Sequence, residues 1–400
     1  MQQLYAAILS DGMHLLPQVR LSRPMYLMQY NALKTQIDEG IAKVVESSKF
    51  ILGPQVAELE KELAEYVGIR HCISCANGTD ALILTLMAWG IGEGDAVFVP
   101  DFTFIASASC AMIRGATPVP VDIDPQTFNM SPEALEGSIL KTIEEGKLRP
   151  SVIISVDLFG QPADYPRIQA LADRYSLRLL EDGAQGFGGA IGGQRACSFG
   201  DAATTSFFPA KPLGCFGDGG AIFTDDDELD VELRSLRVQG SSPEDKYDNR
   251  SVGLNSRLDT LQAAILLVKL RAFKEYEIEA VNCIADKYTD QLKDIVITPF
   301  VPGNYLSSWA QYTILLENKL QRDGLQQYLK ENGIPSMIYY PKGLHAQTVL
   351  KNSRIAADAF PNTAMVSQTC LSLPMHPYMS DEDINRVCRS VKAYLHEIGA

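Results

Sequence analysis

The sequence lacks any long apolar run. No stretch approaches the roughly 18 uninterrupted apolar residues that a membrane-spanning helix requires. The start of the chain also lacks the basic, apolar and small-residue segments of a secretion signal. These absences argue against a membrane-spanning or secreted protein. We therefore expect a cytoplasmic protein with no membrane partner.

A local excess of positive charge is also missing. The formal net charge is −14, and no stripe rich in lysine or arginine offsets it. Such a chain repels phosphodiester backbones, so nucleic acid is not an expected partner. The 400 residues do supply an apolar fraction of 46%. This fraction suits one large α/β domain with a smaller domain attached.

The sequence also has few cysteine and histidine residues at the spacing of a metal site. The eight cysteines are scattered, and His71, Cys72 and Cys75 form a short H-C-x-x-C that no second ligand pair follows at zinc-site spacing. Several cysteines lie within apolar runs, where a reduced thiol packs as a small hydrophobic group. We expect free thiols, no metal site, and a buried strand that carries Cys72 and Cys75 inward.

Short β-rich runs alternate with helical stretches, which is typical of a parallel sheet covered by helices. The runs cover residues 96–100, 117–121, 152–157, 177–181, 202–208 and 221–224. A glycine-rich turn joins the last two runs and is too short for a crossover helix, so one strand is expected to be antiparallel. The pattern predicts an α/β fold with a mixed, mostly parallel sheet.

The chain divides into three parts by pattern. Residues 1–24 show no clear period and are expected to form an N-terminal extension. Residues 25–275 carry the sheet, preceded by two helices that are joined by a turn near Gly53. Residues 276–400 are expected to form a small α+β domain. Its strand-like runs are 309–316 and 334–340, with one helix between them and another over 381–398.

One lysine stands out in the segment TTSFFPAKPLGCFGDGG, residues 204–220. Lys211 lies between an apolar β-rich run and a glycine-rich turn. An amine that leaves an apolar strand is partly desolvated, which favours the neutral form that attacks a carbonyl. Lys211 is therefore a candidate for Schiff-base chemistry. Taken alone, the motif fits a surface lysine after a strand equally well.

A carboxylate follows another apolar strand. Asp182, in the string EDGAQ, is placed at the carboxyl edge of the predicted sheet, where ligands bind in open α/β folds. A carboxylate there can keep a pyridine nitrogen protonated, with an ion pair worth about 4 kcal/mol at roughly 4 Å and an effective dielectric constant near 20. The competing interpretation is a helix N-cap, a position that aspartate also favours.

Two further segments offer a phosphate site and a stacking ring. Gly78 and Thr79 open an amphipathic helix after an apolar run, so free backbone N–H groups and the helix dipole can hold a phosphate, with the Ser206 hydroxyl beside them. Phe104, at another strand end, can lie flat against a planar ring. Helix capping and core packing explain each of these alone. Together with Asp182 and Lys211, they are the parts of a pyridoxal phosphate site.

These residues stand in strings that resemble the DegT-type sugar aminotransferases, which are fold type I pyridoxal phosphate enzymes. The strings are NGTDAL (77–82), PDFTFIAS (100–107), LFGQPAD (158–164), EDGAQ (181–185), SFFPAKPLG (206–214), GDGGAIFT (217–224) and GLNSRLDTLQAAIL (253–266). The resemblance covers about residues 25–395. It implies an enzyme that moves an amino group from L-glutamate to a nucleotide-linked keto sugar.

The resemblance also implies a role for each cofactor-binding residue. Lys211 bonds to the cofactor aldehyde, Asp182 pairs with the pyridine nitrogen, Gln185 touches the ring hydroxyl, Phe104 stacks on the ring, and Gly78, Thr79 and Ser206 hold the phosphate. Asn255 is expected to reach the phosphate across a homodimer interface, so that each active site is shared. Relatives that dehydrate sugars carry histidine in place of the lysine, so Lys211 favours transamination.

Several strings look most like the aminotransferases that act on UDP-2-acetamido-2-deoxy-3-keto-glucuronic acid in O-antigen and other surface polysaccharide biosynthesis. They are SCANGTDAL, SFFPAKPLGC, NSRLDTLQAAILL, AQYT and SLPMHP. By this analogy Arg257 grips the uronate carboxylate through its bidentate guanidinium, with an ordinary salt bridge as the competing interpretation. Tyr339 and Tyr340 belong to a second substrate loop, in which the family pattern has histidine before the tyrosine.

Two alternatives stay open for the function. One is an aminotransferase that acts at C4 of a UDP- or dTDP-linked 4-keto-6-deoxy sugar, which has no carboxylate for Arg257 to hold. The other is a non-catalytic regulatory protein on the same fold. His345 and His376 are interpreted as structural loop histidines rather than substrate contacts.

Overall fold

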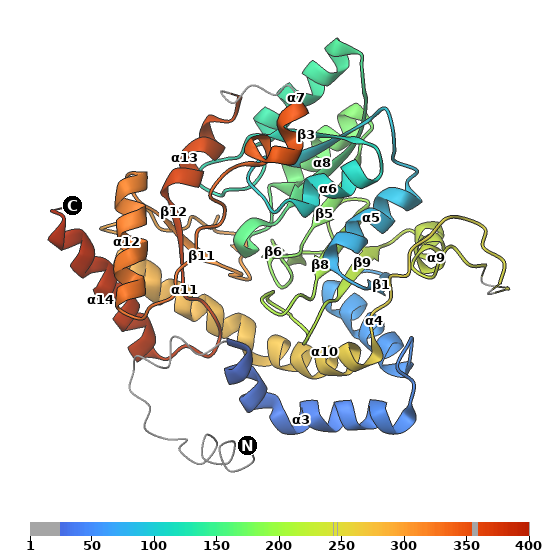
Figure 1. Cartoon of the computed structure of the whole chain (residues 1–400), viewed down its shortest axis with the longest axis horizontal. Helices are drawn as coiled ribbons and strands as arrows, with labels where there is room; N and C mark the ends of the chain where they lie inside the picture. The colour runs from blue at the N-terminus through green and yellow to red at the C-terminus, as the bar shows by residue number, and fades with distance from the viewer. Residues whose placement is uncertain (1–24, 243, 246, 354–358, 400) are drawn as a thin grey trace.

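The computed structural model describes residues 25–399 except 243, 246 and 354–358, so the expected extension over residues 1–24 lies outside the described residues. A seven-stranded sheet with helices on both faces forms the larger part (Figure 1). In spatial order its strands are β1 (His71–Cys75), β9 (Gly220–Thr224), β8 (Ala202–Ser206), β5 (Arg178–Asp182), β4 (Arg149–Val156), β2 (Asp95–Pro100) and β3 (Thr117–Val121).

Strand β9 runs against the other strands of this sheet. It pairs antiparallel with β1 and β8, whereas β8, β5, β4, β2 and β3 pair in parallel. The prediction of a mixed, mostly parallel sheet is confirmed. Its cause is the short connection after β8, whose two ends, Ser206 and Gly220, pair with each other. Because β1, β2, β5 and β8 point the same way, the segments that follow them meet at one sheet edge.

Side chains along each strand alternate between two cores. On β2, Val97 and Val99 face one core and Ala96 and Phe98 face the other. Helices α5 (Gly78–Ala88), α6 (Ala106–Ile113) and α9 (Asp227–Leu236) cover the first face, and α4 (Pro54–Val67), α7 (Pro132–Glu145), α8 (Tyr165–Tyr175) and α10 (Thr260–Ala272) cover the second. Helix α3 (Met25–Ser47) packs along α10 (Figure 1).

A separate core lies in the C-terminal part of the chain. A two-stranded antiparallel sheet packs against helices there. Its elements are β11 (Tyr312–Leu315), β12 (Cys370–Leu373), α11 (Ile278–Leu292), α12 (Lys319–Glu331) and α14 (Asp381–Glu397). Helix α10 continues into α11 through a π-helical turn, Phe273–Glu277, which includes the predicted domain boundary. The division into domains at residue 275 stays a prediction.

Shorter elements connect these parts. They are β6 (Ala190–Ile191), β7 (Gln194–Arg195), β10 (Tyr305–Leu306), α13 (Pro361–Thr369) and the 3₁₀ turns Leu158–Gly160, Leu344–Ala346 and Thr348–Ser353. Strands β10, β6 and β7 form a small sheet of their own. Among all helices of the described residues, none is long and apolar enough to cross a membrane.

The prediction of a strand over residues 334–340 is wrong. Met337 pairs with Ser372 as an isolated bridge, and the partner of β11 is β12. Pro335 and Pro341 bracket the segment and lack an N–H group, which limits ladder pairing. The segment is therefore irregular, and it leads to Tyr339 and Tyr340.

All eight cysteines are free, as expected, and every one except Cys283 on α11 is buried. Cys72 and Cys75 of β1 face the two opposite cores. Burial raises the pKa of both thiols, that of Cys75 to about 12. His71 Nε2 lies 2.7 Å from Asp227 Oδ1. The H-C-x-x-C string is thus a buried strand, as predicted, with a hydrogen-bonded histidine at its start.

Candidate active site

The start of helix α5 and the β8–β9 hairpin approach each other closely at the carboxyl edge of the central sheet. A Cβ built on Gly78 would lie 2.7 Å from Ser206 Cβ, and one built on Gly220 would lie 2.6 Å from the carbonyl oxygen of Asn77. Only glycine permits both approaches. Asn77 Oδ1 caps the helix by accepting from Asp80 N at 2.8 Å. The amides at the helix start, including Thr79, have no intrahelical partner, so an anion can use them.

Asp182 and Lys211 lie at the same edge and act on each other electrostatically. Asp182 ends β5 and is 6% exposed. It accepts from Ser107 Oγ at 3.1 Å and from Ala184 N at 3.2 Å. Burial raises the pKa of the Asp182 carboxyl, and the charge of Lys211 opposes the shift. Burial lowers the pKa of the Lys211 amine, which Asp182 opposes. Lys211 is therefore neutral more often than an exposed lysine, as expected from its place after an apolar strand.

Gln185 joins this edge to the C-terminal part of the chain. Its Nε2 donates to Tyr340 Oη at 3.2 Å, and its Oε1 accepts from Phe159 N at 2.8 Å. Ser308 Oγ donates to the Gln185 carbonyl at 2.7 Å. The Tyr339 and Tyr340 rings contact each other with centroids 5.8 Å apart. The structure thus brings the predicted substrate loop against the residue predicted to touch the cofactor ring.

Two phenylalanines of the turn after β2 differ in exposure. Phe102 is fully buried, and its ring packs edge-on against Tyr340 and Phe159, with centroids 5.9 and 6.3 Å away. Phe104 is 56% exposed. The Phe104 ring is therefore free to stack on a ligand, and its role as a stacking platform stays a prediction.

Asn255 and Arg257 flank a residue that is attached to the phosphate cradle. Ser256 is fully buried, and its Oγ accepts from Ala76 N at 3.1 Å. Asn255 is exposed and Arg257 is half-buried. Within the described residues, neither of these two side chains makes a hydrogen bond or an ion pair. Both polar groups are therefore available to a ligand or a second subunit, and their roles stay predictions.

The chain matches one family of known proteins over residues 31–392, the DegT/DnrJ/EryC1/StrS aminotransferase family. The chain belongs to this family. It is 44% identical over 364 residues to UDP-2-acetamido-2-deoxy-3-oxo-D-glucuronate aminotransferase of Pseudomonas aeruginosa, which covers 91% of this chain and 97% of the relative. It is also 41% identical over 371 residues to a pleiotropic regulatory protein of Geobacillus stearothermophilus, which covers 92% and 96%.

A solved structure supports the same assignment. The crystal structure of a DegT DnrJ EryC1 StrS aminotransferase from Brucella abortus superposes with a TM-score of 0.89 at 49% sequence identity. The match covers 92% of this chain and 97% of that chain. The fold is therefore the fold type I arrangement of pyridoxal phosphate enzymes, as the sequence predicted.

A cleft of about 50 Å³ opens beside Lys211 in this family member. Residues of the C-terminal part line the cleft, together with Gln29 of helix α3. Gln29 Nε2 donates to Glu277 Oε1 at 2.8 Å, and Gln29 Oε1 is buried without a partner among the described residues. His376 also lines the cleft, and burial lowers its pKa to about 4, so it is neutral. His345 does not line the cleft and lies against Asp101, in the turn after β2.

The sequence did not assign two residues of this site. Ser107 closes the string PDFTFIAS and lies four residues after Thr103, with which it shares a hydrogen bond of 3.3 Å. Its place at the start of α6, just after the carboxyl end of β2, was the signal. Gln29 gave no signal, because it reaches the cleft only through the packing of α3 on α10.

A second lysine near the glycine-rich turn is structural in this aminotransferase. Lys269 on α10 is 1% exposed, and its Nζ donates to the Gly214 carbonyl in the glycine-rich turn. Burial lowers its pKa to about 8, while Glu277 opposes the shift. The ammonium also lies 5.3 Å from the centre of the Phe216 ring. Lys269 thereby fixes the turn that follows Lys211 to the helix beneath it.

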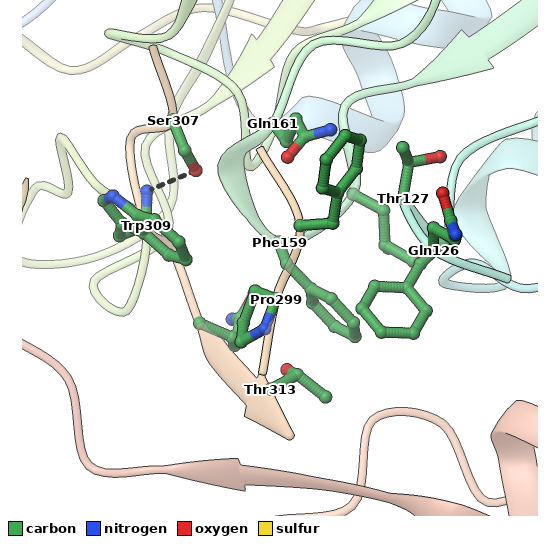
Figure 2. A pocket seen from close by; sticks show the side chains of 12 residues that line it. Gln126, Thr127, Phe159, Gln161, Pro299, Ser307, Trp309 and Thr313 are labelled. Carbon is green, nitrogen blue, oxygen red and sulfur yellow. Dashed lines mark hydrogen bonds between the residues drawn. The ribbon is translucent and has the colours of Figure 1, made fainter. Parts of the chain in front are cut away.

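Figure 2 shows a separate hollow beside the Phe159 segment, with Gln161 and Trp309 on its walls. Trp309 N donates to Ser307 Oγ at 3.1 Å on its rim. The volume of this hollow, about 20 Å³, is enough for about one water molecule and too small for a sugar. The cleft beside Lys211 is larger and contains the candidate lysine, so it stays the candidate site.

Proposed function

We propose that this chain is a pyridoxal phosphate-dependent aminotransferase that moves the amino group of L-glutamate to C3 of UDP-2-acetamido-2-deoxy-3-keto-glucuronic acid, a step of surface polysaccharide biosynthesis. The observation that carries the proposal is that Lys211, whose pKa burial lowers, lies close enough to the buried Asp182 carboxylate for the two charges to interact. Support for the substrate comes from the 44% identical relative, which is named for this 3-oxo sugar.

The residues present fit the cofactor. The proposed phosphate cradle consists of Gly78, Thr79 and Ser206, and the approach of Ser206 to the helix start leaves room only for glycine at position 78. The free backbone N–H groups of this helix start are suited to binding a phosphate. When bound, pyridoxal phosphate supplies an aldehyde and a protonated ring that withdraws electrons from the reacting carbon. Asp182 would keep the ring nitrogen protonated, and the hydroxyl of Ser107 fixes the Asp182 carboxylate in position.

Lys211 performs two tasks in this proposal. Its amine would hold the cofactor aldehyde, and burial, which lowers the pKa of this amine, favours the neutral form that the bond requires. The same amine would carry the proton from Cα of L-glutamate to the cofactor carbon that bears the nitrogen. In the second half-reaction it would carry the proton from that carbon to C3 of the keto sugar.

A homodimer completes the proposed site. Asn255 is exposed, its side chain makes no hydrogen bond within the described residues, and it stands next to Ser256, which is hydrogen-bonded to the cradle segment. In the proposed dimer, Asn255 of each subunit binds the phosphate in the other subunit. Arg257 then faces the carboxylate of the sugar that occupies the shared site.

A panel of keto sugars tests the proposal. The purified protein with pyridoxal phosphate, L-glutamate and the UDP-linked 3-keto uronate is expected to release 2-oxoglutarate and the 3-amino sugar, detected by mass spectrometry. UDP- and dTDP-linked 4-keto-6-deoxy sugars are expected to give neither product. Turnover of the 4-keto sugars alone would support the C4 alternative. Absence of 2-oxoglutarate with every sugar would support the regulatory alternative.

Replacing Arg257 by alanine separates the two sugar classes. Loss of a charge-assisted, bidentate contact is worth about 1.5–3 kcal/mol, so KM for the uronate is expected to rise by roughly 10- to 150-fold. A sugar without a carboxylate is expected to bind the variant as it binds the wild type. Arg250→Ala is the matched control, because Arg250 is exposed and bonds to Glu244. An unchanged KM for the uronate in Arg257→Ala would show that this arginine does not hold the carboxylate.

A further inference from the structure

His345 lies against the turn that carries Phe104, although 244 residues separate it from Asp101 in the chain. His345 Nδ1 lies 2.6 Å from Asp101 Oδ2, and His345 N donates to Asp101 Oδ1 at 2.7 Å. Leu344 N donates to the backbone carbonyl of Asp101 at 2.7 Å. Asp101 is fully buried. One short segment of the C-terminal part therefore satisfies both oxygens of a buried carboxylate.

This contact is tight on every side. A Cβ built on Gly343 would lie 2.2 Å from Asp101 Oδ2 and 2.5 Å from Thr363 Cγ2, so only glycine lets the segment approach. The His345 ring stacks on Phe360, with centroids 4.8 Å apart and planes 12° from parallel. The ring is therefore held by a hydrogen bond at its edge and an aromatic contact on its face.

The turn that His345 holds also contacts the active site. Phe104 belongs to this turn, and Phe102 of the same turn packs against the Tyr340 ring. Ser107, one helical turn further on, donates to Asp182. Tyr340 itself comes from the segment that ends in His345 and accepts from Gln185. The contact between His345 and Asp101 thus connects two segments that each touch the site.

We propose that His345 is a positioning residue, which keeps the Tyr340 segment closed on the turn that carries Phe104. Without its side-chain donor, one oxygen of the buried Asp101 carboxylate has no partner, and water must enter between the two segments to solvate it. The Tyr340 segment and the turn that carries Phe104 then separate, and both side chains lose their positions in the site. The inference rests on the proposed function in one respect, that Phe104 and Tyr340 contact cofactor and substrate.

Two substitutions of His345 test this role. His345→Phe keeps a ring on Phe360 but removes the donor to Asp101, and it is expected to raise KM for the keto sugar by roughly 10-fold. It is also expected to weaken the visible circular dichroism of the bound cofactor and to speed proteolysis of the 339–347 segment in the apoprotein. His345→Asn places an amide nitrogen near the position of Nδ1 and is expected to restore all three readouts to within about threefold of wild type.

Thr363→Val is the matched control. It removes the hydrogen bond of 3.0 Å from Thr363 Oγ1 to Asp122, which also attaches the C-terminal part to the sheet edge but does not involve Tyr340. If His345→Phe changes KM and dichroism no more than Thr363→Val at an equal loss of unfolding temperature, His345 is only structural and the inference is wrong. If His345→Phe does not fold, His345→Gln, whose amide cannot reach the place of Nδ1, is judged by the same readouts. Dichroism and proteolysis need no turnover, so they decide the matter even if the proposed sugar is incorrect.

Discussion

Replacing Lys211 by alanine is expected to abolish amino transfer and to leave the fold intact. The variant loses both the amine that bonds to the cofactor and the base that moves the proton, so kcat is expected to fall by at least about 10³-fold. Release of 2-oxoglutarate measures the loss. Borohydride reduction followed by peptide mass spectrometry is expected to find the cofactor mass on Lys211 in the wild type and nowhere in the variant.

Lys269→Met is the matched control for this experiment, because it removes the buried lysine that binds the turn after Lys211. Lys269 donates to the Gly214 carbonyl and does not line the cleft. The control is expected to lower the unfolding temperature and still carry the cofactor mass on Lys211. A cofactor mass on another lysine, or full activity in Lys211→Ala, would contradict the assignment. In the wild type, the lowered pKa of Lys211 predicts that cofactor attachment persists to lower pH than for an exposed lysine.

Asp182→Asn is expected to lower kcat by roughly 10²- to 10³-fold while the cofactor stays attached to Lys211. The neutral amide cannot keep the ring nitrogen protonated, and the ion pair it removes is worth about 4 kcal/mol at an effective dielectric constant near 20, close to 10³-fold in rate. Single-turnover kinetics with L-glutamate measure the loss.

Ser107→Ala is the companion variant, since it removes only the hydrogen bond of 3.1 Å to the carboxylate. A single hydrogen bond to a charged group contributes about 1.5–3 kcal/mol, so the loss in this variant is expected to be smaller than in Asp182→Asn. A kcat of Asp182→Asn within about tenfold of wild type would show that the ring nitrogen does not depend on this carboxylate.

Local patterns in the sequence were enough to predict most strands of the central sheet. The run Thr117 to Val121 was predicted as a strand with the bounds that β3 has, and the antiparallel strand followed from the short connection after β8. Asp182 and Lys211 could be placed because each follows a strand, and parallel strands end at one edge. These inferences use neighbouring residues and the direction of the chain.

Contacts between distant segments could not be predicted in the same way. Residues 334–340 read as a strand, but Pro335 and Pro341 and the competing strand β12 leave one bridge in place of a ladder. The bonds of His345 to Asp101 and of Tyr340 to Gln185 join residues that no local spacing relates. Asn255 and Arg257 were found only through the family resemblance, because within the described residues their side chains make no hydrogen bond or ion pair that a local pattern could reveal.

The placement of the thiols makes this protein suited to labelling without mutagenesis. Cys283 is the one cysteine that solvent reaches, while burial raises the pKa of the others, for example that of Cys388 to about 11. A maleimide fluorophore should therefore react at a single position. That position is on α11, in the same helix as Val281, which lines the cleft beside Lys211. A dye attached there can report, through its emission, on events next to the reactive amine.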